Sequence, residues 1–195
     1  MNAKRPCVFF DRDGIVNASP GPGYVERWAD FHLLPPFIDA VRVAARHGFV
    51  SAVITNQRGI ATGILSSSSV AEIHAHLTTA LAAAGAPLLG VYMCPHARDA
   101  CSCRKPQPGL LLEAARDHDL DLSRSWMVGD QPTDVEAGRR AGCRTILVNA
   151  ALPIAAADYH IRGVDELPAL LHRLLPVDRQ GGECYGLAGL PREAF

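Results

Sequence analysis

Two carboxylates stand one residue apart in Asp11-Arg12-Asp13-Gly14, directly after a short apolar run. In an extended chain side chains two residues apart point to the same side, so both carboxylates can serve one site, and Gly14 permits a turn directly after them. One carboxylate could then attack phosphorus while the other handles the proton of the leaving group. Taken alone, such a pair is more often a turn or a helix cap.

Further polar side chains follow other apolar runs. Thr55 could hold phosphate oxygens together with neighbouring backbone N–H groups, and Lys105 could neutralise transition-state charge. Asp130 offers the oxygen ligands that Mg²⁺ prefers, and Asp134 stands where a helix dipole favours a carboxylate. Each residue alone has an ordinary explanation in turn chemistry, solvation or helix capping, but their order along the chain is informative.

A short loop carries three thiols and one imidazole, from Cys94, His96, Cys101 and Cys103. Four sulfur and nitrogen ligands with no open position predict a structural tetrahedral zinc site, and not a catalytic one. The same thiolates would also accept iron, and coincidental cysteines are the alternative. We expect the metal to stiffen the loop and so to position Arg104 and Lys105.

The elements that must position these residues alternate between short apolar runs and helical patterns. Strands are expected at Cys7–Phe10, Val50–Ile54, Leu89–Met93, Trp126–Val128 and Arg144–Val148. Helices are expected at Pro36–His47, Ser69–Ala84, Gly109–His118, Pro132–Ala141 and Glu166–Leu174. The alternation predicts an α/β fold, a Rossmann-like three-layer sandwich around a mostly parallel sheet. Ligands of such sheets bind outside the carboxyl ends of the strands, where the polar residues would meet.

The domain organisation is expected to be simple. The length of 195 residues favours one domain, placed at residues 1–175 with the zinc loop at 94–103. Residues 176–195 are Gly-rich and are expected to form a C-terminal tail. The segments between the polar motifs are too short for a large cap domain. The oligomeric state stays open, with a monomer favoured.

Composition excludes several classes of protein. Lys and Arg number 19 against 20 Asp and Glu, so no basic surplus points to nucleic acid. No apolar run is long enough to cross a bilayer, and Cys7–Phe10 is too short for a signal peptide. We therefore expect a cytoplasmic protein without a membrane or nucleic-acid partner. Among the other histidines, His74 and His76 are two residues apart on one expected helix, so they do not share a face, and both are expected to be surface or edge residues.

The ordered motifs FFDRDGIVN, VITNQ, CRKPQPG and GDQPTD resemble the haloacid dehalogenase superfamily of phosphohydrolases, over about Val8 to Val148. The resemblance implies that Asp11 is a nucleophile that forms an aspartyl-phosphate. It implies that Asp13 acts first as general acid and then as general base for the hydrolytic water.

The same resemblance implies Mg²⁺ as a cofactor. The ion would be held by Asp11, by the backbone carbonyl of Asp13 and by Asp130. Thr55 and Lys105 would stabilise the phosphoryl group. Asp134 would orient Lys105, or the water molecules bound to the metal, without binding the metal itself.

Within the superfamily the zinc loop resembles two families, the heptose 1,7-bisphosphate phosphatases and the histidinol-phosphate phosphatases. Gly23-Tyr24-Val25 and the segment 106–109 favour the heptose family, whereas the short spacer 97–100 is closer to the histidinol family. Two residues depart from the heptose pattern: Arg58 replaces a small residue, and Gln131 replaces a frequent lysine.

The leading expectation is therefore an Mg²⁺-dependent phosphatase that removes the 7-phosphate of D-glycero-D-manno-heptose 1,7-bisphosphate, of undecided anomer, on the way to nucleotide-activated heptose. The alternatives are a histidinol-phosphate phosphatase and, from another class, a non-catalytic zinc-stabilised binding module. The candidate substrate-binding residues are Arg12, Gly23, Tyr24, Asn56, Gln57, Arg58, Arg104 and Gln131.

Overall fold

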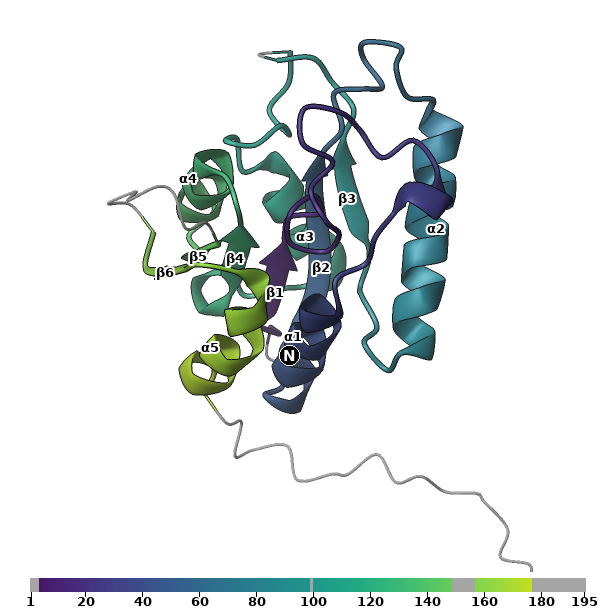
Figure 1. Cartoon of the computed structure of the whole chain (residues 1–195). Helices are drawn as coiled ribbons and strands as arrows, with labels where there is room; N and C mark the ends of the chain where they lie inside the picture. The colour runs from purple at the N-terminus through teal and green to yellow at the C-terminus, as the bar shows by residue number, and fades with distance from the viewer. Residues whose placement is uncertain (1–3, 99, 149–156, 177–195) are drawn as a thin grey trace, which may run out of the picture.

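The computed structural model describes residues 4–98, 100–148 and 157–176. A six-stranded sheet with order β3-β2-β1-β4-β5-β6 forms its centre, and every neighbouring pair is parallel (Figure 1). The predicted α/β architecture is confirmed. The strands are β1 Cys7–Phe10, β2 Val50–Asn56, β3 Val91–Cys94, β4 Trp126–Gly129, β5 Arg144–Val148 and β6 Tyr159–Ile161.

Four strands differ from the sequence prediction. β3 and β4 differ by one or two residues at their ends. β2 continues through Thr55 and Asn56, because these residues pair with Met93 and Cys94 of β3. Thr55 therefore lies in a strand and not in the turn after it. The short edge strand β6 was not predicted, since three residues carry too little periodicity to recognise.

Among the described residues, five α-helices cover the sheet. They are α1 Pro35–Arg46, α2 Ser67–Ala83, α3 Gly109–His118, α4 Pro132–Arg140 and α5 Leu167–Leu174. The start of α2 follows from capping, because the Ser66 side chain accepts a hydrogen bond from the backbone N–H of Ser69. Three short 3-10 helices complete the described elements: η1 Trp28–Asp30, η2 Leu122–Arg124 and η3 Val164–Glu166.

The core forms two layers, one on each face of the sheet. In β1, Val8 and Phe10 pack with residues of α1, α2 and α5, whereas Cys7 and Phe9 pack with residues of α3 and α4. Figure 1 shows α1 and α5 together on one face and α3 and α4 on the other. Alternate side chains of a strand point to opposite faces, so a strand buried on both faces reads as a continuous apolar run.

The parallel register gathers the carboxyl ends of the central strands at one edge. Asp11 directly follows β1, and its backbone N–H donates to the carbonyl of Val128 in β4 at 2.8 Å. Thr55 near the end of β2 and Asp130 after β4 flank it. The connections within the described residues add no cap domain to this edge.

Two further sequence expectations concern the C-terminal tail and membrane-spanning segments. The proposed tail lies outside the described residues, apart from residue 176. Within the described part of the chain, none of the helices combines the length and apolar character that a membrane crossing requires.

Candidate active site

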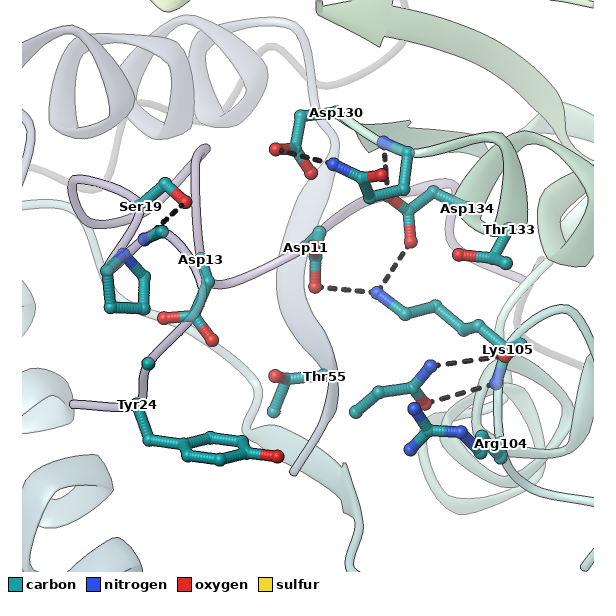
Figure 2. Close-up of a pocket in the computed structure, with 15 residues that line it drawn as sticks. Asp11, Asp13, Ser19, Tyr24, Thr55, Arg104, Lys105, Asp130, Thr133 and Asp134 are labelled. Carbon is teal, nitrogen blue, oxygen red and sulfur yellow. Dashed lines mark hydrogen bonds and ion pairs between the residues drawn. The ribbon is translucent and has the colours of Figure 1, made fainter. Parts of the chain in front are cut away.

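The polar residues of the sequence motifs line one cavity of about 270 Å³ at the carboxyl edge of the sheet. Figure 2 shows Asp13, Ser19 and Tyr24 on one side of it and Lys105 and Arg104 on the other. All residues expected to act in catalysis line this cavity, namely Asp11, Asp13, Thr55, Lys105, Asp130 and Asp134. The structure thus brings together side chains from four separate segments of the chain.

A buried lysine joins two of the carboxylates. The Nζ of Lys105 lies 2.6 Å from Oδ1 of Asp11 and 2.7 Å from Oδ1 of Asp134, and it also donates to the carbonyl of Ile54 at 2.9 Å. The neighbouring carboxylates raise the pKa of Lys105 although burial alone would lower it, so the ammonium stays charged. This geometry gives the expected contact between Asp134 and Lys105.

The position of Lys105 is also set through its backbone. The side-chain amide of Asn56 donates to the carbonyl of Lys105 and accepts from its N–H, both at 3.1 Å. Asn56 ends β2, so this paired contact fastens the lysine loop to the sheet. Asp134 is fixed in a similar way, because its Oδ2 accepts from the backbone N–H of Gln131 at the start of α4.

Asp13 is held by donors from three residues. Arg12 contacts both of its carboxylate oxygens at 3.0 Å through Nη2, and Asn17 and Gln57 each donate from a side-chain amide at 3.0 Å. Gln57 also donates to the Thr55 hydroxyl at 2.9 Å, which connects Asp13 to the other side of the cavity. The side chain of Asp13 is nevertheless 26% exposed, so it stays open to a ligand.

Two expected substrate contacts are corrected by this arrangement. Arg12 is 0% exposed and Gln57 is 1% exposed, and neither lines the cavity. Both side chains are used to hold Asp13, because a buried guanidinium and a buried amide need hydrogen-bond partners. Asn17, which the sequence analysis did not single out, belongs to the same network.

The remaining substrate candidates divide into two groups. Gly23, Tyr24, Asn56, Arg104 and Gln131 line the cavity as expected, whereas Arg58 is not among its lining residues in the described part of the chain. Four further lining residues were not predicted from the sequence: Ser19, Pro20, Gly21 and Thr133. Serine and glycine in a loop carry no chemical signal until the fold places the loop over the site.

The carboxylates of the site fit a divalent cation. Ligand oxygens of Asp11, Asp130 and Asp134 lie within 4.8 Å of one another. With Lys105 as the nearby cation, three ionised carboxylates leave a net charge of −2. Gly14 makes the close approach possible, because it adopts φ +94° and a Cβ there would lie 2.5 Å from the Asp130 carboxylate. Hard oxygen ligands with this charge suit Mg²⁺.

The pKa values of these carboxylates also indicate a site that needs a cation. Burial raises the pKa of Asp11 to about 7, with Asp134 adding to the effect and Lys105 opposing it. Burial and the Asp11 charge raise the pKa of Asp130 to about 6. Both values exceed the usual 3.8, so between about pH 4 and about pH 7 the folded protein binds more protons than the unfolded chain. Without a cation, the protein therefore loses stability as the pH rises through these values.

We expect Mg²⁺ to raise the melting temperature more at about pH 8 than at about pH 5.5, since protons compete for Asp11 and Asp130 at the lower pH. Thermal melts in saturating Mg²⁺ and in EDTA at both pH values measure this difference. The Asp130→Asn variant serves as the comparison and should show a much smaller gain at about pH 8. An equal gain at both pH values would contradict a metal site built on these carboxylates.

The second cluster is formed by the four side chains of the loop that is expected to bind zinc. Sulfur atoms of Cys94 and Cys101 lie 3.5 Å apart, and those of Cys101 and Cys103 lie 3.2 Å apart. The Nδ1 of His96 lies 3.7 Å from the Cys94 sulfur and 3.3 Å from the Cys103 sulfur. Ligands of a tetrahedral zinc are about 3.5 to 3.8 Å apart, which follows from its bond lengths. The four side chains thus converge at a spacing that fits one zinc ion.

Replacing Cys101 with Ser should remove the zinc and lower the melting temperature by about 5–10 °C, because a loop with few apolar residues loses its crosslink. The expected phosphate release should fall as well, since the loop leads directly into Arg104 and Lys105. Metal analysis, thermal melts and turnover check this, with Cys184→Ser as the matched control. Full activity in the metal-free variant would refute a role of the loop in positioning these residues.

The carboxyl edge of this parallel sheet presents a buried aspartate, a second aspartate two residues on, a threonine, a lysine and an acidic pair. This set of residues defines a phosphohydrolase of the haloacid dehalogenase (HAD) type. Comparison with known proteins agrees, since a model of the HAD-hydrolase-like family matches residues 102–152. The D-glycero-beta-D-manno-heptose-1,7-bisphosphate 7-phosphatase of Yersinia pestis is 36% identical over 182 residues, which cover 86% of this chain and 96% of that protein.

Two further relatives point the same way. The D-glycero-D-manno-heptose-1,7-bisphosphate 7-phosphatase of Thermosynechococcus vestitus is 43% identical over 156 residues, covering 74% of this chain and 79% of that protein. A crystal structure of D,D-heptose 1,7-bisphosphate phosphatase from B. bronchiseptica, with magnesium and phosphate, superposes with a TM-score of 0.76 at 29% identity, covering 86% and 98% of the two chains. This chain therefore belongs to the HAD-like phosphatase family that includes the heptose bisphosphate phosphatases.

Proposed function

We propose that this chain removes the 7-phosphate of D-glycero-D-manno-heptose 1,7-bisphosphate in an Mg²⁺-dependent reaction that proceeds through an aspartyl-phosphate on Asp11. The observation that carries the proposal is the buried contact of Lys105 with Asp11 and Asp134, beside Asp130 and Asp13, at the carboxyl edge of the sheet. The choice of substrate rests on the similarity of the chain to heptose bisphosphate phosphatases.

The first half of the reaction breaks the bond between phosphorus and the sugar oxygen. A carboxylate oxygen of Asp11 attacks phosphorus, and the electron pair of the broken bond stays on the sugar oxygen. Asp13 supplies the proton that this oxygen needs. Thr55 and Lys105 offer hydrogen bonds and positive charge to the phosphoryl oxygens during the transfer.

The second half releases inorganic phosphate. Asp13, now ionised, takes a proton from a water molecule that attacks the phosphorus of the aspartyl-phosphate. The bond between phosphorus and the Asp11 oxygen breaks, and the Asp11 carboxylate is restored. Bound Mg²⁺, held by Asp11, Asp130 and the backbone carbonyl of Asp13, would supply the charge that offsets repulsion between carboxylate and phosphate.

A second cavity supports a substrate with two phosphates. It measures about 630 Å³ and shares Arg104, Lys105 and Gln131, among others, with the first cavity. Arg98 and Arg104 line it, and Nη1 of Arg104 is buried without a hydrogen-bond partner among the described residues. A buried donor without a partner favours an anion there, so Arg104 would receive the phosphate that does not react.

The two departures from the heptose pattern have different consequences. Arg58 lines neither cavity within the described residues, so the structure offers it no contact with a second phosphate. Gln131 lines both cavities and donates to Asp130 at 3.1 Å. A glutamine at this position brings no charge, so the second phosphate would rely on Arg104, with Arg98 as the other arginine that lines the second cavity.

The proposal includes the setting of the reaction. The enzyme would act in the cytoplasm on a small phosphorylated sugar, during synthesis of nucleotide-activated heptose for lipopolysaccharide. Zinc would be structural and Mg²⁺ catalytic. A nucleic acid, a membrane or a second subunit would not be required.

The decisive experiment measures phosphate release with Mg²⁺ from both anomers of heptose 1,7-bisphosphate and from histidinol phosphate. We expect one heptose anomer to be preferred over histidinol phosphate by more than about tenfold in kcat/KM, roughly 1.4 kcal/mol of transition-state binding. Preference for histidinol phosphate would leave the chemistry in place and overturn the substrate. Release from none of the three, by zinc-loaded protein, would support a non-catalytic binding module.

A further inference from the structure

A charged side chain is completely buried beside the proposed general acid. Arg12 is 0% exposed, and its Nε and Nη2 donate to the Asp13 carboxylate at 3.0 to 3.2 Å. Its guanidinium also lies 5.9 Å from the centre of the Phe31 ring. Burying a cation costs free energy unless each of its N–H groups finds a partner, so the far side of the guanidinium needs an acceptor.

His74 of α2 provides this acceptor. Its Nε2 lies 3.3 Å from Nη1 of Arg12, on the side of the guanidinium that Asp13 does not occupy. Arginine can only donate, so Nε2 of His74 must accept and the imidazole is neutral with its proton on Nδ1. Burial and the charge of Arg12 lower the pKa of His74 to about 4, in agreement with a neutral ring. His74 is half-buried at the edge of the interior, where this contact gives it a partner that the sequence did not reveal.

The contacts form a chain of hydrogen bonds from α2 to the cavity, running from His74 through Arg12 to Asp13. We propose that His74 is a positioning residue, which holds the Arg12 guanidinium so that it aims the Asp13 carboxyl at the leaving group. The inference rests on the proposed function, because it assumes that Asp13 acts as general acid. His74 itself touches neither the substrate nor the reacting atoms.

The consequence for catalysis depends on the leaving group. A sugar alkoxide is a strong base and cannot leave without a proton, so a misplaced Asp13 slows its release. p-Nitrophenolate is a weak base and leaves without a proton. The second half of the reaction needs Asp13 as a base with either substrate, so the two substrates differ in the step that forms the aspartyl-phosphate, which kcat/KM reports. A positioning role of His74 therefore lowers kcat/KM for sugar phosphates and spares kcat/KM for p-nitrophenyl phosphate, whereas general damage to the fold lowers both equally.

The test compares His74→Phe, His74→Gln and the wild-type enzyme on heptose 1,7-bisphosphate and on p-nitrophenyl phosphate, with Mg²⁺ and zinc present. We expect His74→Phe to lower kcat/KM for the sugar phosphate by about 10- to 100-fold, part of what a general acid contributes. The kcat/KM for p-nitrophenyl phosphate should change by less than about threefold. His74→Gln keeps an acceptor and should restore most of kcat/KM for the sugar phosphate. His76→Phe, the same change two residues away, is the matched control.

Each outcome bears on a separate claim. Equal losses on both substrates, or no loss on either, would overturn the positioning role while leaving the phosphatase in place. A wild-type enzyme that hydrolyses neither ester would defeat the proposed function, and the inference with it. If His74→Phe does not melt cooperatively, His74→Asn replaces it, because the shorter side chain withdraws the acceptor from Arg12.

Discussion

Replacing Asp11 with Asn abolishes phosphate release, with an expected loss of about 10⁴-fold or more in kcat, as removal of a nucleophile costs other hydrolases. The amide keeps the shape of the side chain but cannot form an acyl phosphate by attack on phosphorus. The fold should be unaffected, because Lys105 keeps its contact with Asp134 at 2.7 Å. Turnover of heptose 1,7-bisphosphate and a thermal melt measure the two halves of this prediction.

The stability of this variant adds a second, independent check. Burial and the nearby carboxylates raise the pKa of Asp11 to about 7, so its charge is unfavourable in metal-free protein near neutral pH. Removing that charge should leave the melting temperature in EDTA equal to that of the wild type, or higher. Asp39→Asn, an exposed change on α1, is the control. Retained turnover in Asp11→Asn would refute the aspartyl-phosphate mechanism.

Much of the fold could be predicted because its signals are local. β1, β5 and α3 have the bounds that apolar runs and helical spacing predict, and the alternation of elements predicts the parallel sheet. The site followed from the same pattern, since the carboxyl ends of parallel strands meet at one edge. Asp11 and Asp130 could therefore be placed together although they are far apart in the sequence.

The contacts that the sequence did not reveal are those between distant polar side chains. Arg12 lies between two aspartates and suggests a substrate contact, yet its partners Asp13 and His74 make it part of the buried interior. Asn56 fits ordinary turn chemistry, yet it fastens the backbone of Lys105 from 49 residues away. Such pairs have no periodicity, and they become visible only when the chain is folded.

Replacing Lys105 with Met should have the largest combined effect on stability and activity. The lysine side chain is 2% exposed and contacts Asp11 at 2.6 Å and Asp134 at 2.7 Å. Methionine fills a similar volume but leaves two buried carboxylates facing each other, which should cost about 3–5 kcal/mol of unfolding free energy. Turnover should fall by about 10²- to 10³-fold, because a fixed positive charge near the phosphoryl oxygens is lost.

A double variant separates the two effects. In Lys105→Met with Asp134→Asn, only one of the two facing carboxylates stays charged, so part of the lost stability should return while activity stays low. Urea unfolding in EDTA measures the stabilities, and phosphate release with saturating Mg²⁺ measures the activities. Losses of stability that simply add in the double variant would show that the carboxylates do not interact through the lysine. Activity within tenfold of the wild type in Lys105→Met would exclude its charge from the transition state.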